Sequence, residues 1–163
     1  MTKEQFSAKI LAMERSLYRV AKFLLRNDED CADAIQNAIL KAYGKLHTLK
    51  NEEYFKTWMT RIVINESYAI LRANKRLVSY EEYMSDDQAV EEEEYSPIFE
   101  EITKMKEKYR VPFVLHYVEG YTTAEIAKML SLSEGAVKTQ LFRARNQLKA
   151  QLKGVDGYER MEL

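Results

Sequence analysis

Residues 121–145 read YTTAEIAKMLSLSEGAVKTQLFRAR, and this stretch decides the fold of the C-terminal half. Thr122 and Glu125 have the spacing of a capping box, in which a hydroxyl and a carboxylate each bind a backbone amide at a helix start. Ser133 is placed to cap a second, longer and basic helix. Its apolar stripe is Val137, Leu141, Ala144, Leu148 and Leu152. Two helices joined by a three-residue turn are typical of a helix-turn-helix.

The segment before this motif, from Ile102 to about Val118, predicts one helix or a bent pair. Pro112 lacks a backbone N–H and must start or kink a segment there. The N-terminal 76 residues predict three or four further helices. The first has apolar residues in steps of three and four, which is the pattern of one buried stripe: Phe6, Ile10, Met13, Leu17, Val20 and Leu24.

A second N-terminal helix begins after Asn27, which is a favourable N-cap. Its apolar side consists of Ile35, Ala38, Ile39, Ala42 and Leu46. The third runs from about Tyr54 to Arg76. Gly 5 and Pro 2 in 163 residues leave little turn chemistry for a β sandwich or barrel, so the chain is expected to be all-α.

The net charge of -1 hides an uneven distribution. Residues 1–76 hold 14 Lys and Arg against 9 Asp and Glu, and residues 102–163 hold 11 against 7. Residues 77–101 hold ten acids and no base. We therefore expect two small basic domains, at 1–76 and 97–153, joined by an acidic flexible linker at 77–96, with a tail at 154–163. The linker is either a solvated spacer or a segment that competes with DNA for the basic domains.

The sequence holds few residues suited to catalysis. His47 and His116 are far apart, no Gly-rich phosphate loop is present, and Cys31 is the single cysteine. We predict no catalytic residue, no metal site, no cofactor and no small-molecule substrate, because no convergent polar site can be assembled. Every apolar run is too short to cross a bilayer, so we expect a cytoplasmic protein that is not an integral membrane protein.

Two helices carry residues suited to nucleic acid. The final helix offers donors, acceptors and cations for base edges and phosphates: Lys138, Thr139, Gln140, Phe142 and Arg143. The third helix combines aromatics with cations, as proteins that bind single-stranded DNA do: Tyr54, Phe55, Trp58, Arg61, Asn65 and Arg72. Phe55 and Trp58 can equally be core residues, Asn65 either a buried amide or a base reader, and Phe142 either a packing or a DNA contact.

In this order the motifs resemble those of extracytoplasmic-function (ECF) sigma factors, the two-domain minimal form of the sigma-70 family. The resemblance covers about residues 6–153 and rests on three segments: 28–43, 55–72 and 121–145. It implies a three- or four-helix region 2 domain, which binds core RNA polymerase and melts the minus-ten element, and a region 4 helix-turn-helix domain that reads the minus-35 element.

The same resemblance implies residue roles. Asp33, Gln36 and Leu40 would contact polymerase, the third helix would bind minus-ten DNA, and the final helix would enter the major groove at minus-35. It also implies an anti-sigma factor as a partner. Three other classes compete with this interpretation: a conventional helix-turn-helix regulator, which would need an effector pocket or dimer face, an adaptor or decoy protein, and an enzyme.

Overall fold

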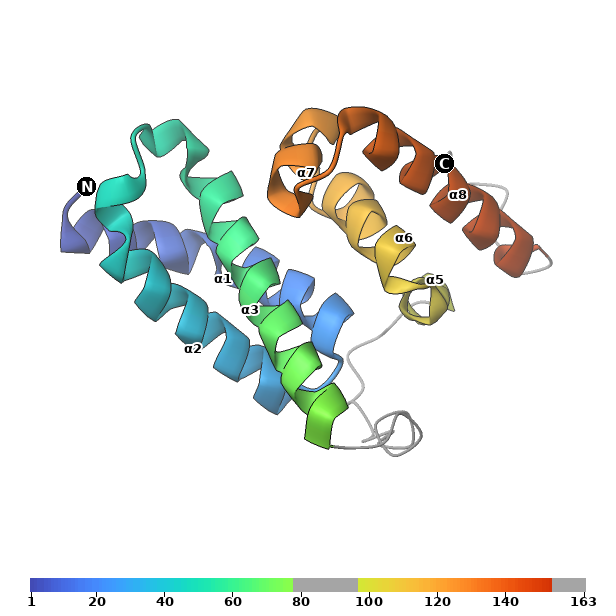
Figure 1. Cartoon of the computed structure of the whole chain (residues 1–163), viewed down its shortest axis with the longest axis horizontal. Helices are drawn as coiled ribbons and strands as arrows, with labels where there is room; N and C mark the ends of the chain where they lie inside the picture. The colour runs from blue at the N-terminus through green and yellow to red at the C-terminus, as the bar shows by residue number, and fades with distance from the viewer. Residues whose placement is uncertain (78–96, 154–163) are drawn as a thin grey trace. The chain divides into compact units, whose positions relative to one another are not determined.

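A computed structural model describes residues 1–77 and 97–153, and the chain divides into two compact units within 1–90 and 91–163 (Figure 1). All regular elements in these described ranges are helical, which confirms the predicted all-α class. The predicted acidic linker falls on residues 78–96 except at its first residue. That segment and the tail at 154–163 lie outside the described residues.

Unit 1 consists of three helices that pack on one another: α1 (Lys3–Leu25), α2 (Asp28–Gly44) and α3 (Phe55–Leu77). Asn27 caps α2 by accepting a hydrogen bond from the Asp30 amide, as its position predicted. The core includes Leu17 of α1, Ala38 of α2 and Met59 of α3, and all three side chains are buried. The buried residues of α2 are all small, which lets the neighbouring helices approach closely: Cys31, Ala34, Ala38 and Ala42.

The second helix ends earlier than the sequence pattern predicted. It stops at Gly44, and Leu46 belongs instead to a single 3-10 turn, Leu46–Thr48. A second 3-10 turn, Glu52–Tyr54, leads directly into α3. The α2–α3 connection is therefore a loop of short turns, which presents polar backbone and side chains at one end of the bundle.

Unit 2 contains α5 (Pro97–Lys104), α6 (Glu107–Phe113), the π-helical turn η3 (Val114–Val118), α7 (Thr123–Leu130) and α8 (Glu134–Leu152). The capping box of Thr122 and Glu125 is present on α7, and Ser133 caps α8. The predicted stripe of α8, from Val137 to Leu152, is buried. Helices α7 and α8 thus form the predicted helix-turn-helix, with α6 packed behind α8.

The segment before the motif bends at a different place from the one expected. Ile102 lies on the separate helix α5, and the chain turns at Met105 and Lys106, whereas Pro112 lies inside α6. The guanidinium of Arg110 is buried and donates to the carbonyls of Thr103 and Met105, at 3.0 and 2.9 Å. Because these carbonyls end α5, the arginine satisfies acceptors that a helix C-terminus leaves open and stabilises the corner.

Within the described ranges, no helix is long and apolar enough to cross a membrane.

Candidate nucleic-acid interface

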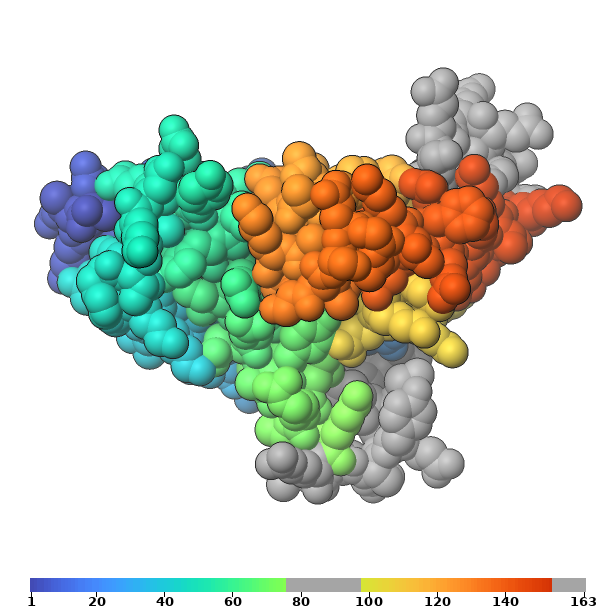
Figure 2. All heavy atoms as spheres, turned by 45° about the horizontal axis from the view of Figure 1, so that its top comes forward, coloured from blue at the N-terminus to red at the C-terminus, as the bar shows by residue number. Residues whose placement is uncertain are grey.

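Helix α8 lies at the surface of unit 2 (Figure 2), and its exposed polar side chains lie opposite its buried stripe. Lys138, Thr139 and Arg143 are exposed, and Phe142 is 57% exposed, which excludes the packing interpretation of this aromatic within unit 2. With about 100° between successive residues, Thr139, Phe142 and Arg143 fall within one sector of about 100° around the helix. The face can enter a groove as a unit.

Gln140 is placed differently from the other four residues predicted on this helix. It is half-buried, and its Oε1 atom is buried with no hydrogen-bond partner among the described residues. Its side chain lies toward the core side of α8. The sequence pattern grouped Gln140 with its exposed neighbours because it is polar, whereas helical geometry rotates it by 100° from Thr139.

The start of α8 is tied to the start of α7. Thr123 donates from its hydroxyl to Oε1 of Glu134 at 2.8 Å, and Nζ of Lys138 lies 3.6 Å from the same oxygen. The hydrogen bond from Thr123, followed by the charge of Lys138, holds the pKa of the Glu134 carboxyl below its ordinary value. These contacts fix the two helix N-termini relative to each other, which sets the angle at which α8 is presented.

A second polar stripe runs along α3. Residues 54, 58, 61, 65 and 72 follow one another in steps of four, three, four and seven, which is the spacing of a single helical face. Tyr54, Arg61, Asn65 and Arg72 are exposed along this stripe, and Trp58 is half-buried beneath it. Asn65 is therefore a surface amide and not a buried one. Of the predicted residues, five lie on a common face.

Phe55 lies outside this stripe. It is only 3% exposed and makes edge-on ring contacts with Phe6 and tilted contacts with Trp58, at centroid distances of 5.8 and 6.0 Å. Phe55 is a core residue that anchors the start of α3. Tyr54 is the preceding residue and lies about 100° away around the helix axis. It therefore points away from the core, and its side chain is 59% exposed.

The loop before α3 rests on α1. Nζ of Lys9 lies 5.6 Å from the centroid of the Phe55 ring and 3.9 Å from a carboxylate oxygen of Glu52. A shallow hollow of about 320 Å³ borders this contact. It is lined by Lys9, Ala12, Met13, Glu52, Glu53, Phe55 and Lys56. Helix α1 thus supports the 3-10 turn that carries Tyr54.

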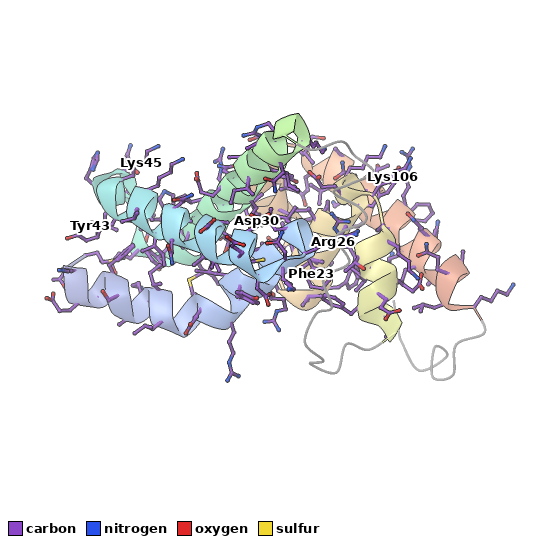
Figure 3. The ribbon with its side chains drawn as sticks, turned by 90° about the horizontal axis from the view of Figure 1, so that it is seen from below. Phe23, Arg26, Asp30, Tyr43, Lys45 and Lys106 are labelled. Carbon is purple, nitrogen blue, oxygen red and sulfur yellow. The ribbon has the colours of Figure 1, made fainter. Side chains whose placement is uncertain are left out.

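A third stripe lies on α2 and contains the remaining predicted residues. Asp33, Gln36 and Leu40 are exposed and spaced by three and four residues, so they share one face. Leu40 is 73% exposed, and Tyr43 extends the stripe by another step. Asp30 and Tyr43 mark the two ends of this helix (Figure 3). Leu40 and Tyr43 thus give this face two exposed apolar side chains on successive turns.

The beginning of α2 is held by polar contacts. Asp28 accepts hydrogen bonds from the Tyr18 hydroxyl and the Lys22 ammonium of α1, and Lys22 is buried. Asp30 accepts from the Asn74 amide of α3 at 2.9 Å. These contacts connect all three helices of unit 1 at one end. They keep the faces of α2 and α3 in a fixed relation.

Two tyrosines beside α8 were not among the residues predicted from the sequence. Arg145 donates from Nη1 to the Tyr117 hydroxyl at 2.7 Å. On α6, hydrogen bonds from Arg143 and then Lys108 lower the pKa of the Tyr109 hydroxyl. The spacing of residues along one helix could not reveal these pairs, because each joins two different helices. The sequence pattern did identify the cations of α8 themselves.

In the parts of the chain that the structure describes, no three side chains of His, Cys, Asp or Glu gather into a metal site. The polar residues lie on convex helix faces.

Family comparisons match each unit separately. Residues 10–77 match the model described as Sigma-70 region 2, and residues 97–148 match the model described as Sigma-70, region 4. RNA polymerase sigma factor SigV of Bacillus subtilis is 26% identical over 147 residues, covering 85% of this chain and 86% of SigV. ECF RNA polymerase sigma factor SigM of Mycobacterium tuberculosis is 30% identical over 137 residues, covering 82% of this chain and 70% of SigM.

Two solved structures share the fold. The sigma factor RpoE from Bartonella quintana, in complex with the anti-sigma factor NepR, aligns with a TM-score of 0.78 and 23% identity over 94% of this chain and 99% of that chain. CnrH, in complex with the cytosolic domain of CnrY, aligns with a TM-score of 0.72 and 22% identity over 95% and 92%.

Proposed function

Since the chain belongs to the sigma-70 family, as an RNA polymerase sigma factor of the ECF type, we propose that its two helical domains divide the recognition of a promoter. Residues 1–76 bind core RNA polymerase and recognise and melt the minus-ten element. Residues 97–153 read the minus-35 element. A conventional helix-turn-helix regulator is not favoured, because residues 10–77, which make up most of the first bundle, match region 2.

The observation that carries the minus-35 assignment is the outward face of α8. Thr139, Phe142 and Arg143 occupy one sector, with Lys138 beside it. An arginine can bind guanine O6 and N7 with two hydrogen bonds, and an apolar side chain can contact a thymine methyl group. Lys138 contacts phosphate. Gln140 supports this face from its flank, because its side chain points toward the core side of α8.

The minus-ten element is assigned to the stripe of α3. Tyr54 provides an exposed ring on which an unstacked base can lie, an interaction worth about 1–3 kcal/mol per base. Arg61 and Arg72 neutralise phosphates of the separated strand, and Asn65 reads a base edge. Trp58 forms the floor beneath them, and Phe55 holds the loop in place from inside the core. The cost of unstacking, a few kcal/mol, is offset by these contacts.

Core polymerase is assigned to the stripe of α2. Burial of Leu40 against the polymerase would contribute roughly 1.5–3 kcal/mol, because this leucine is largely exposed in the free chain. Asp33 and Gln36 would supply the polar contacts that set orientation. The chain acts through binding, with the chemistry left to the polymerase, and it works in the cytoplasm, where polymerase and promoter DNA are found.

An anti-sigma factor is the further partner that we propose. This proposal is supported by the similar structure of RpoE, which was solved in complex with the anti-sigma factor NepR. An inhibitor that covers the stripe of α2 or the face of α8 would compete directly with polymerase or DNA. Competition between purified anti-sigma candidates and core polymerase for the full chain would test this partner.

The central experiment is capture of core RNA polymerase by the tagged full chain, followed by run-off transcription on genomic fragments. We expect the wild-type chain to bind polymerase and to initiate at defined sites. Leu40→Asp should lose polymerase binding, whereas Leu11→Asp should retain it, because Leu11 is a comparably exposed leucine (71%) on α1. Absence of polymerase binding by the wild-type chain would contradict the proposed function.

A further inference from the structure

Two arginines near the middle of α8 interact with tyrosines from the segment packed behind that helix. Arg145 donates to the Tyr117 hydroxyl at 2.7 Å, and Arg143 lowers the pKa of the Tyr109 hydroxyl. Positions 143 and 145 differ by about 200° around a helix, so their side chains leave α8 on different sides. Arg143 lies near the centre of the exposed face, and Arg145 on its flank.

Both tyrosines come from the continuous segment formed by α6 and η3, eight residues apart. This segment packs against α8, so its tyrosines lie next to the cations of that helix.

The ring of Tyr117 is itself fixed. It packs against Phe113 with a centroid distance of 4.8 Å and meets the edge of His116 at 4.9 Å. Nδ1 of His116 is 2.8 Å from the Tyr121 carbonyl oxygen. The π-helical turn closes with a hydrogen bond from the Glu119 amide to the Val114 carbonyl. Tyr117 therefore presents its hydroxyl from a rigid support.

A phenol is a suitable partner for a cation that must meet DNA. It orients the guanidinium by a hydrogen bond but leaves the positive charge in place, whereas a carboxylate would compete with a phosphate for the same charge. Lys138, on the same flank, is paired with Glu134 at 3.6 Å. In the described ranges, no carboxylate pairs with Arg145. Arg145 and Lys149 continue the flank as further cations.

Resting on the proposed reading of minus-35 DNA by α8, we propose that Arg145 contacts a phosphate beside the groove and that Tyr117 is the positioning residue that aims it. A helix lying in the major groove has a DNA strand on each side, and cations on its flanks meet the phosphates that fix its register.

The test uses holoenzyme formed from the full chain and core polymerase, with a promoter fragment found by run-off transcription. Tyr117→Phe keeps the ring and removes the hydroxyl. We expect its promoter affinity to fall about 2- to 10-fold, the range for one hydrogen bond. The slope of log affinity against log salt should become shallower by up to about 0.9, the value for one phosphate contact. Arg145→Gln should show the same change in slope.

The variant that carries both substitutions measures the coupling between Tyr117 and Arg145. If Tyr117 acts through Arg145, then Tyr117→Phe has no further effect in the Arg145→Gln background. Tyr18→Phe is the matched control, because it removes a hydrogen-bonded hydroxyl in unit 1 and should leave the salt slope unchanged. Affinity and slope unchanged by Tyr117→Phe, or losses that add fully in the double variant, would overturn the inference. Failure of the wild-type chain to bind polymerase would instead contradict the proposed function on which it rests.

Discussion

Lys41 on α2 donates from Nζ to Oε1 of Glu66 on α3 at 2.6 Å. The carboxylate is the more shielded partner, since Glu66 is 8% exposed and Lys41 lies at the surface. The pair joins the helix assigned to polymerase to the helix assigned to minus-ten DNA. It therefore fixes the register between the two faces on which region 2 depends.

Removing only Lys41 should destabilise the first unit. Lys41→Met leaves the Glu66 carboxylate shielded without this partner, and we expect the free energy of unfolding to fall by about 1–3 kcal/mol. The double variant Lys41→Met, Glu66→Met should recover part of the loss, because no shielded charge remains. Urea unfolding of the full chain measures both, and a double variant less stable than Lys41→Met would contradict this account.

Much of the architecture was predictable because it rests on local patterns. The steps of three and four in α1, the cap at Asn27 and the capping box at Thr122 are each read within one segment, and the structure contains all three features. The ends of the helices were harder to predict from the sequence. The apolar Leu46 fits the stripe of α2 by spacing, yet the helix stops at Gly44 and the chain turns.

The remaining differences arise from tertiary contacts. The corner between α5 and α6 depends on Arg110, whose buried guanidinium binds carbonyls five and seven residues earlier. Because a charged residue in a sequence suggests a surface position, the buried structural role of Arg110 could not be predicted. The roles of Phe55 and Asn65 stayed open for the same reason: spacing defines a face, but packing of α1 decides which face is covered.

Cys31 should be unreactive in the folded chain. The thiol is fully buried in unit 1, and burial raises its pKa from 9.0 to about 12. Thiolate is the reactive form, so a disulfide reagent at pH 8 should modify the protein only as fast as it unfolds. The thiol form is favoured by folding, so this contribution to stability is complete below pH 9 and declines above it. Rapid stoichiometric labelling of the native chain would contradict the prediction.

Asp28 should make unit 1 sensitive to acid. Hydrogen bonds from Lys22 and then Tyr18 hold the pKa of its carboxyl below the ordinary value of 3.8. A lowered pKa stabilises the fold above pH 3.8, and this contribution is lost as the pH falls through the folded-state pKa. Asp28→Asn should therefore reduce stability at pH 7 by about 1–3 kcal/mol, because it leaves the buried Lys22 ammonium without its carboxylate partner.

The measurement is the pH dependence of the unfolding midpoint for both proteins. The wild-type and Asp28→Asn curves should separate at neutral pH and converge below pH 3.8. Curves that stay parallel across this range would show that the carboxylate of Asp28 does not supply the difference.

The capping box of α7 should matter for DNA binding as well as stability. Thr122→Ala removes the hydroxyl that accepts from the Glu125 amide at 3.2 Å, a loss of about 1 kcal/mol. Because α7 orients α8, binding to the minus-35 element should weaken. Thr2→Ala removes the equivalent box on α1 and serves as the control. It should lower stability similarly and leave minus-35 affinity unchanged in a competition assay with minus-35 duplexes.

Arg143 and Lys149 should have different signatures on DNA, although both are exposed cations of α8. Arg143 lies in the sector assigned to base edges, so Arg143→Ala should reduce discrimination at one minus-35 position by about 1–3 kcal/mol. Lys149 lies on the flank, where a phosphate contact carries no sequence information. Lys149→Ala should weaken binding equally on all sequences and make the salt slope shallower by about 0.9.

A set of duplexes with each minus-35 position permuted, titrated with holoenzyme at several salt concentrations, separates the two effects. Arg143→Ala must change the ranking of sequences, and Lys149→Ala must preserve it. If both variants only reduce affinity uniformly, the sector of Arg143 does not face base edges. Helix α8 would then be rotated in the groove toward the flank on which Lys138 and Arg145 lie.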